Sequence, residues 1–167
     1  GFSPKITDFG LAKRLDQTAD LTGSHAVLGT PNYMSPEQAR GQTRYVGPPA
    51  DQYSLGVILY QLLTGDVPFR GDSLSELLAK IVEEVPRSPR QITPEVPLDL
   101  AVICLKCLEK DPARRYDSTE ALADDLRNWR EHRPITARPA TRLERVMKWR
   151  RRYPAVAALI AVSVLAA

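Results

Sequence analysis

Hydrophobic side chains recur at helical spacing in four segments of the chain, and residues 51–64 are the segment with apolar residues on most sides. Apolar side chains surround most of its circumference, which is typical of a helix that is buried on nearly all sides. Gly65 follows directly and is a helix-stop residue. We therefore expect this helix to lie at the centre of the core. Its apolar residues are Tyr53, Leu55, Val57, Ile58, Leu59, Leu62 and Leu63.

Three further segments have the amphipathic pattern of helices that bury one face. A capping box opens the segment 73–84, and a proline stands in the first turn of the segment 97–110. Asp117 and Glu120 cap a last helix that ends near residue 132. The residues expected to point inward are Leu77, Leu78, Ile81 and Val82 in the first segment, Leu98, Val102, Leu105 and Leu108 in the second, and Ala121, Leu122, Leu126 and Trp129 in the third.

The part of the chain before the first helix follows a different pattern. Residues 5–10 have the composition of a short strand that ends at a glycine. Residues 11–49 contain turn formers and several prolines without a sustained period, and loops of this length are usually functional. The chain begins with Gly1 rather than Met and stops within an apolar run, so we interpret it as a fragment of a longer protein.

Composition and charge narrow the class of protein. The chain has 167 residues, of which 43% are hydrophobic and 26% are charged, as is typical of a globular domain. Two cysteines are too few for the disulfide framework of a small secreted scaffold. The net charge of +3 is unevenly distributed along the chain. Residues 127–152 hold ten Lys and Arg and two Glu, so the tail is basic and the residues before it are acidic overall. Since the basic excess belongs to the tail, we predict no nucleic-acid partner.

Four short motifs follow one another along the chain. They are Asp8-Phe9-Gly10, Gly29-Thr-Pro-Asn-Tyr-Met-Ser-Pro-Glu37, Asp51-Gln-Tyr-Ser-Leu-Gly56 and Lys110-Asp-Pro-Ala-Arg-Arg115. In order and spacing they resemble the C-terminal half of a serine/threonine protein kinase domain, particularly of the bacterial, membrane-anchored type. The resemblance covers residues 4–132. It implies an α+β protein-kinase-like fold, of which this chain is the mostly α-helical C-lobe from the Asp-Phe-Gly strand onward.

The resemblance implies a cofactor-binding role for the first motif. Asp8 would chelate the Mg²⁺ that bridges the ATP phosphates, since a carboxylate oxygen is a hard ligand for a hard cation. Phe9 would pack into the core, and Gly10 would let the backbone turn. The expected cofactors are therefore ATP and Mg²⁺. The alternative is that these residues are an ordinary exit from a strand into a loop.

Residues 8–37 would form the activation loop. Thr22 and Ser24 lie where related bacterial kinases carry an activating phosphate, and such a phosphate orders a loop against basic side chains. The alternative is that loops are simply rich in Ser and Thr. Thr30 would lie beside the catalytic base. The residues that would shape the substrate-docking pocket are Gly29, Thr30, Pro31 and Tyr33.

The resemblance also implies two structural roles. Glu37 and Arg115 would form a buried ion pair that joins the end of the activation loop to a distant helical turn. Breaking such a pair costs about 3–5 kcal/mol, whereas a surface salt bridge, the alternative, contributes under about 1 kcal/mol. Asp51 would accept backbone N–H bonds from the catalytic loop, or it is an N-cap, and the two roles are compatible.

Cys104 and Cys107 have the spacing of a redox or zinc motif. They fall within an amphipathic helix, however, and no second cysteine pair or close histidine completes a site. We therefore interpret both as buried thiols. His25 and His132 are solitary and indicate no function.

The tail indicates a membrane anchor. Residues 133–152 form a basic juxtamembrane linker that directly precedes the uncharged, apolar run 153–167. As a helix this run spans about 22 Å, short of the roughly 30 Å of a bilayer core, so we interpret it as a truncated transmembrane helix. The basic cluster predicts a single-pass protein of the cell membrane with its kinase part in the cytoplasm. The alternative is an amphipathic or core-packing tail.

No glycine-rich loop, strand lysine or His-Arg-Asp loop is found in the chain, and in the family all three precede the Asp-Phe-Gly motif. We therefore expect the chain alone to be inactive. Its parent is expected to be a signalling kinase that transfers the ATP γ-phosphate to Ser or Thr hydroxyls of protein substrates, with possible dimers through an extracytoplasmic region. The alternatives are a pseudokinase that acts as a scaffold at the membrane and a free-standing helical interaction module.

Overall fold

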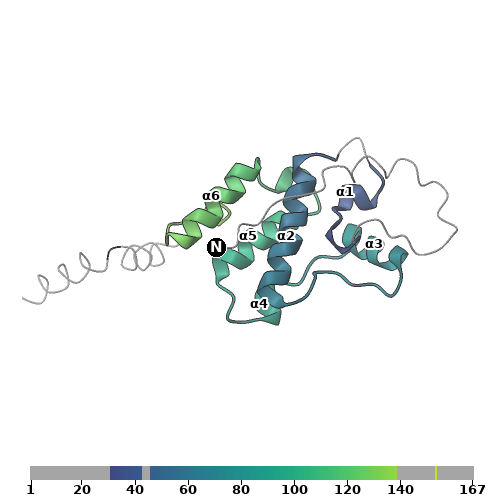
Figure 1. The fold of residues 1–167 in the computed structure, drawn as a ribbon, viewed down its shortest axis with the longest axis horizontal. Helices are drawn as coiled ribbons and strands as arrows, with labels where there is room; N and C mark the ends of the chain where they lie inside the picture. Colours follow the sequence, from purple (N-terminus) through teal and green to yellow (C-terminus); the bar gives the residue numbers. More distant parts are fainter. Residues whose placement is uncertain (1–30, 43–45, 139–152, 154–167) are drawn as a thin grey trace, which may run out of the picture. The chain divides into compact units, whose positions relative to one another are not determined.

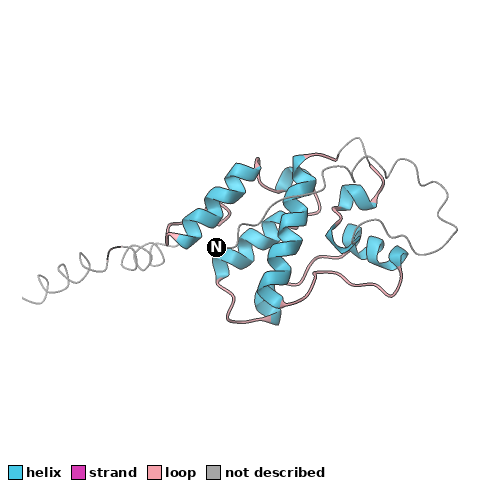
Figure 2. Cartoon of the chain, in the orientation of Figure 1, coloured by secondary structure: helices cyan, strands magenta, loops and turns pink. Residues whose placement is uncertain are grey.

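The computed structural model describes residues 31–42, 46–138 and 153, and the secondary structure within them is helical (Figure 1 and Figure 2). The predicted helical body is thereby confirmed. The strand expected at residues 5–10 lies outside the described residues. The elements are η3 (Pro31–Tyr33), α1 (Pro36–Ala39), α2 (Pro48–Thr64), α3 (Leu74–Glu83), α4 (Pro89–Ile92), α5 (Leu98–Cys107), η5 (Pro112–Arg114) and α6 (Thr119–Arg130).

Helix α2 is the central element of the described region, and α5 packs across it (Figure 1). Two prolines occupy its first turn, where a helix needs no N–H partner, so it begins at Pro48 rather than at the predicted residue 51. It ends at Thr64, and Gly65 closes it with a φ of 82°, a left-handed conformation that suits glycine. The core residues on its inner side are Tyr53, Val57 and Tyr60, packed with Cys104 and Leu108.

One side of α2 is exposed, so the prediction that this helix is buried on nearly all sides is wrong within the described part of the chain. Leu55 and Ile58 are each 44% exposed, and Leu62 is 78% exposed. Together with the exposed Asp51 they recur at helical spacing and form one stripe, which we call the open face of α2. Apolar periodicity predicts burial only where another element covers the face, and the described helices that pack on α2 lie on its other sides.

The inward face predicted for residues 97–110 is confirmed only in part: Leu108, just after α5, is buried in the core and Val102 packs against it, but Leu98 does not face inward. Leu98 is 40% exposed, and Val102 and Leu105 are half-buried. Helix α5 packs against both α2 and α6, so residues on more than one of its sides are buried. The helix ends at Cys107 rather than near residue 110. Its buried apolar residues are Leu100, Ala101, Ile103, Cys104 and Cys107.

Helices α2 and α5 approach each other closely at Gly56. A Cβ atom built on Gly56 would lie 2.6 Å from the Cβ of Cys107. The Sγ of Cys104 donates to the carbonyl oxygen of Gly56 at 3.5 Å. Both cysteines are free and buried, and burial raises the pKa of each thiol, that of Cys107 to about 12. Their interpretation as buried thiols is confirmed.

The starts of α3 and α6 are capped by serines. The Oγ of Ser73 accepts from the backbone N–H of Glu76 at 3.2 Å, as predicted. The Glu76 carboxylate accepts from the N–H of Asp72 at 2.9 Å, one residue earlier than in a standard capping box. The predicted cap of α6 is wrong by one residue, since Ser118 and not Asp117 accepts the capping bond. Both residue types cap helices well, so composition does not choose between neighbours.

The packed body extends beyond α6. Ile135 is 4% exposed and belongs to the same core cluster as Tyr116 and Leu122. The boundary that we predicted at residue 132 therefore lies inside the packed region. Within the described residues no helix is long and apolar enough to cross a membrane. Apart from Tyr153, the predicted anchor at 153–167 lies outside them.

The close contact at Gly56 predicts that adding one methyl group there lowers the stability of the helical body. Gly56→Ala should destabilise the body by about 1–3 kcal/mol, because overlap with Cys107 outweighs the gain in helix propensity. Leu62→Ala, at an exposed position of the same helix, should change stability by less than about 0.5 kcal/mol. Urea unfolding followed by circular dichroism measures both variants. A Gly56→Ala protein as stable as the wild type would contradict this packing.

Candidate functional site

Some of the predicted site residues lie within the described region, at the end of the predicted activation loop and where it joins the helical body. These are Pro31, Tyr33, Glu37, Asp51 and Arg115. The others lie outside the described residues, and their roles stay predictions. These are Asp8, Phe9, Gly10, Thr22, Ser24, Gly29 and Thr30.

Tyr33 attaches the end of the predicted activation loop to α2. It closes the single turn of η3 that begins at Pro31. Its hydroxyl donates to Oε1 of Gln61 at 2.7 Å, and its carbonyl oxygen accepts from Oγ of Ser54 at 2.8 Å. The two bonds hold the side chain and the backbone of the same residue at different turns of α2. The segment that precedes α1 is therefore fixed to the central helix.

Glu37 and Arg115 form a buried, two-pronged ion pair. The Nη1 of Arg115 lies 2.8 Å from Oε1 of Glu37, and its Nη2 lies 2.9 Å from Oε2. The side chains are 0% and 3% exposed, so this is the buried arrangement and not the surface alternative. Ser35 caps α1 and so orients Glu37, which stands in the first turn of that helix. Residues 78 positions apart in sequence are thus joined.

Every N–H of the Arg115 guanidinium has an acceptor. Besides the two carboxylate oxygens, Nη1 donates to the carbonyl oxygen of Pro49 at 2.7 Å and Nε donates to that of Glu109 at 2.8 Å. Nη2 also donates to the carbonyl oxygen of Lys110 at 3.4 Å. A guanidinium carries five N–H donors, and these bonds use all of them. The group also lies over the Tyr53 ring, 5.1 Å from its centre.

The environment of Glu37 keeps its carboxyl group ionised. Burial alone raises its pKa, but the hydrogen bonds from Arg115 and the backbone and the Arg115 charge outweigh burial. The pKa therefore lies below its ordinary value. Arg115 thus connects three parts of the chain: the end of the predicted activation loop at Glu37, the start of α2 and the turn before η5.

Asp51 is not the N-cap of α2. The helix begins at Pro48 and its N-cap is Gly47, which places Asp51 within the first turn. Its side chain is exposed and stands at the head of the open face of α2. A carboxylate there is accessible to backbone N–H donors from another segment, as its predicted role requires.

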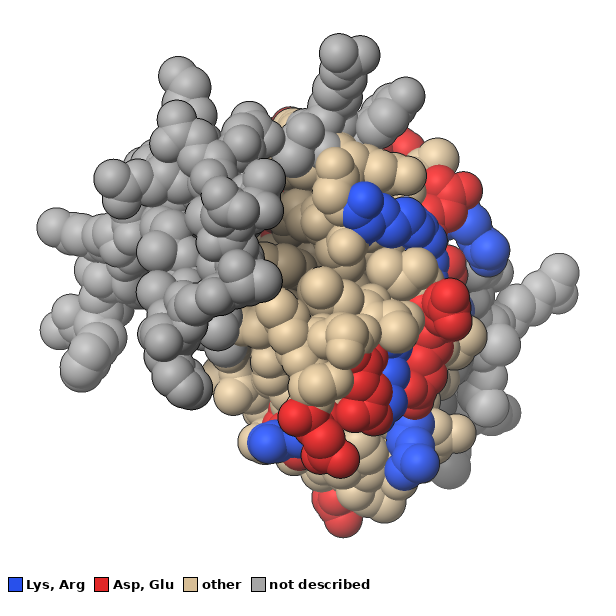
Figure 3. Space-filling view, turned by 90° about the vertical axis from the view of Figure 1, so that its right-hand side faces the viewer, with Lys and Arg blue, Asp and Glu red and all other residues tan. Residues whose placement is uncertain are grey.

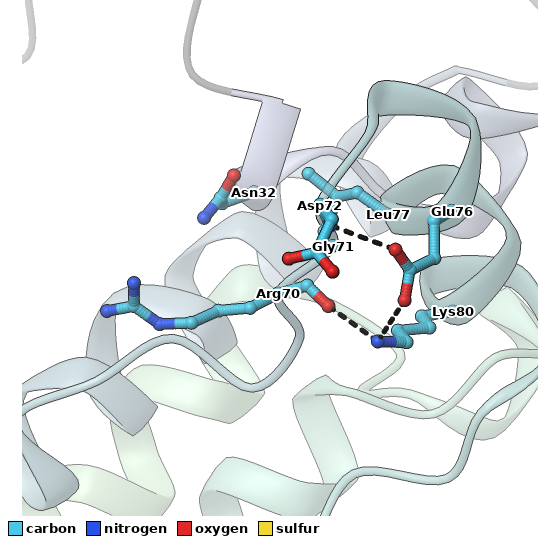
Figure 4. Close-up of a pocket in the computed structure, with 7 residues that line it drawn as sticks. All are labelled: Asn32, Arg70, Gly71, Asp72, Glu76, Leu77 and Lys80. Atoms are coloured by element: carbon cyan, nitrogen blue, oxygen red, sulfur yellow. Dashed lines mark hydrogen bonds and ion pairs between the residues drawn. The ribbon is translucent and has the colours of Figure 1, made fainter.

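A polar cavity of about 410 Å³ lies beside η3, and sequence reasoning missed it. Figure 4 shows Asn32 on one side and the loop and first turns of α3 on the other. Within it the Glu76 carboxylate pairs with Nζ of Lys80 at 2.7 Å, and that Nζ also donates to the Arg70 carbonyl oxygen at 2.9 Å. On the side of the molecule that includes α3, charges of both signs lie close together (Figure 3). The lining residues are Asn32, Arg70, Gly71, Asp72, Glu76, Leu77 and Lys80.

The model of the protein kinase domain family matches residues 2–126. This chain belongs to the protein kinase family. Three relatives are serine/threonine kinases by name: PknB of Mycobacterium leprae, 41% identical over 73% of this chain, PrkC of Bacillus subtilis, 39% over 74%, and a probable serine/threonine-protein kinase of Clostridium perfringens, 37% over 79%. The chain spans about one fifth of the length of these relatives, 18–19% of each. The kinase resemblance and the serine/threonine kinase family are thereby confirmed.

Within this kinase chain, the Glu37–Arg115 pair should be far more important for stability than its neighbour. Arg115→Ala leaves a buried carboxylate without its partner and should cost about 3–5 kcal/mol. Arg114→Ala is the matched control, since Arg114 is exposed and lies 3.6 Å from Glu109, a pair worth under about 1 kcal/mol. Urea midpoints of the two variants give the comparison. Equal losses would show that the buried pair contributes no more than a surface one.

The same pair predicts acid sensitivity of the kinase fold. Because the pKa of Glu37 is lowered in the folded state, its contribution is complete above the unfolded pKa and is lost as pH falls through the folded pKa. The free energy of unfolding should therefore decrease from about pH 5 to about pH 3. Glu37→Gln should be less stable at pH 7 but lose less on acidification, whereas the exposed control Glu95→Gln should keep the wild-type slope. Identical slopes in all three proteins would rule out this role of Glu37.

Proposed function

We propose that this chain is the C-terminal lobe and membrane-proximal tail of a signalling serine/threonine kinase. The complete enzyme transfers the γ-phosphate of ATP to serine or threonine hydroxyls of protein substrates. Family membership supports the reaction class, and the intact motifs around Asp8, Thr30 and Glu37 favour an active enzyme. The main support for the proposal is that Tyr33 and Glu37, at the end of the predicted activation loop, are bonded to the helical body.

Phosphoryl transfer depends on positioning and electrostatic stabilisation more than on covalent chemistry of the protein. The substrate side of the site therefore has to be rigid. Tyr33 is bonded to α2 at two points, and Glu37 is clamped by Arg115. Thr30 directly precedes this fixed segment. A substrate peptide that docks on residues 31–34 would thus lie on a surface anchored to the core, beside the polar cavity at Asn32.

The cofactors of the proposed reaction are ATP and Mg²⁺, which neutralises the charge that develops on the phosphates. Asp8 would hold the metal, because a carboxylate oxygen is a ligand that Mg²⁺ prefers. Phe9 and Gly10 would orient that carboxylate. Phosphorylation at Thr22 or Ser24 would add negative charge to the loop and order it against basic side chains.

The open face of α2 supports the view that the lobe works with a further segment. Leu55, Ile58 and Leu62 leave apolar surface uncovered along the central helix, and Asp51 offers a carboxylate at its head. A catalytic loop that packs on this face would bury the apolar stripe and donate backbone N–H bonds to Asp51. The general base belongs to that loop, so the chain alone would transfer no phosphate.

The tail supports a membrane location for the kinase. We propose that residues 153–167 start a single transmembrane helix and that the basic residues 133–152 keep the catalytic part in the cytoplasm. Dimerisation through an extracytoplasmic region would bring two catalytic parts together.

A scaffold without catalysis is the second candidate. A pseudokinase could keep Asp8, Thr30, Glu37 and Arg115 and yet lack the general base in the preceding catalytic loop. A pseudokinase would keep the fold of the helical body and bind partners at the membrane. The two candidates differ in one measurable property, phosphoryl transfer by the complete kinase domain.

The kinase proposal predicts the effect of a single carboxylate. In the complete kinase domain, Asp8→Asn should reduce phosphoryl transfer from radiolabelled ATP to a protein substrate by at least about a hundredfold, because metal binding is lost. Asp117→Asn, an exposed residue of the helical body, is the control and should retain wild-type activity. The chain of residues 1–167 alone should show no transfer. Absence of transfer by the unmodified complete domain would favour the scaffold instead.

A further inference from the structure

The chain reverses direction at the end of α6. The carbonyl oxygen of Asn128 accepts from the N–H of Arg133 at 2.7 Å, and that of Trp129 accepts from the N–H of His132 at 3.1 Å. This is the bond pattern of a Schellman motif, and His132 occupies its left-handed position with a φ of 56°. Glycine is usual at such a position. The turn sends residues 133–138 back along the body instead of away from it.

The returning segment is held by one buried carboxylate, that of Asp125 in α6, which is 0% exposed. Its Oδ1 accepts from the N–H of Thr136 at 2.7 Å and from Oγ1 of the same residue at 2.8 Å. Its Oδ2 accepts from the N–H of Ala137 at 2.9 Å and from the hydroxyl of Tyr116 at 3.0 Å. Burial raises the pKa of this carboxyl, but the bonds from Thr136, Ala137 and Tyr116 outweigh burial and lower it.

Two further contacts place the segment against α5 and the core. The side chain of Ile135 is buried in a cluster with Leu100 and Leu122. Nη2 of Arg138 lies 3.3 Å from Oδ1 of Asp99, in the first turn of α5. The segment is thus held at three successive places by an apolar side chain, by backbone N–H groups and by a charge pair.

The returning residues 131–138 lie beyond the part of the chain that the kinase family model matches, which ends at residue 126, whereas Asp125 lies within it. We propose that residues 131–138 form a C-terminal clip, closed by Asp125, that fixes the point at which the chain leaves the helical body. The clip belongs to the body and not to the tail. Whatever lies beyond residue 138 is therefore attached to α5 and α6 at a defined site.

If residues 153–167 are the membrane anchor proposed above, the clip limits the greatest distance between the helical body and the membrane. With the clip closed, fourteen residues, 139–152, separate the body from the anchor, a reach of at most about 50 Å. Opening the clip frees residues 131–138 and raises the limit to about 80 Å. Closing it therefore lowers the greatest distance at which the body can stand from the bilayer surface.

Hydrogen exchange by mass spectrometry tests the clip in the complete chain, purified in detergent. Asp125→Asn should reduce the protection of the Thr136 and Ala137 amides by about tenfold or more, since a charged acceptor is lost. Asp124→Asn, whose exposed carboxylate pairs with Arg127, is the matched control and should leave protection unchanged. Thr136→Val removes only the hydroxyl that donates to Oδ1 of Asp125. It should also reduce protection, and it tests the proposal even if the Asp125→Asn protein does not fold. Unchanged protection in both clip variants would overturn the proposal.

Energy transfer tests the consequence for reach. A dye on Glu95→Cys, in an exposed loop, reports the approach to headgroup-labelled vesicles of phosphatidylcholine and phosphatidylserine. Opening the clip with Asp125→Asn should lower the transfer efficiency, and Asp124→Asn should not. Lost amide protection with unchanged transfer would overturn the link between clip and reach. Failure of the wild-type chain to bind vesicles would instead contradict the proposed membrane anchor, and the exchange result for the clip would still hold.

Discussion

The helical body is organised around the buried pair of Glu37 and Arg115. Two charges removed from water are costly unless every donor and acceptor finds a partner. Here the guanidinium meets that condition through the carboxylate and three backbone carbonyls, those of Pro49, Glu109 and Lys110. These carbonyl groups lie at the start of α2 and in the turn before η5, so satisfying the guanidinium positions both segments. The loop end, the central helix and that turn must therefore keep one relative arrangement.

A second buried carboxylate, that of Asp125 in α6, also has hydrogen-bond donors for both of its oxygens. Asp125 has no cationic partner within hydrogen-bonding distance among the described residues, and its charge is balanced by four neutral donors instead. Two of them are the consecutive backbone N–H groups of Thr136 and Ala137, which any residue except proline could supply. The site therefore depends on the backbone conformation there more than on the side chains. Glu37 fixes how the loop enters the body, and Asp125 fixes how the chain leaves it. Both connections depend on ionised groups whose pKa values are lowered.

The features that could be predicted from the sequence are those with a local cause. Gly65 ends α2, and Ser73 begins α3, because one residue suffices for each. The inward face of α5 was predicted only in part, since apolar residues occur on several sides of that helix and the sequence does not show its close approach to α2 at Gly56. The Glu37–Arg115 pair was accessible only through the family resemblance, because no periodicity links residues so far apart. The clip was not predicted because residues 131–138 have no helical or strand pattern, although Ile135 and Ala137 are apolar residues within them.

The open face of α2 connects these observations to function. A stable helical body would normally cover Leu55, Ile58 and Leu62, and each remains exposed beside a core that is otherwise well packed. Arg115 contacts α2 at the Pro49 carbonyl oxygen and at the Tyr53 ring, away from this face, so the buried pair positions the helix without covering the open face. Preorganisation of this kind suits an enzyme whose catalysis depends on positioning. The loop end is bonded to the same helix that carries the open face, and in the proposed kinase that helix would align a catalytic loop and a substrate.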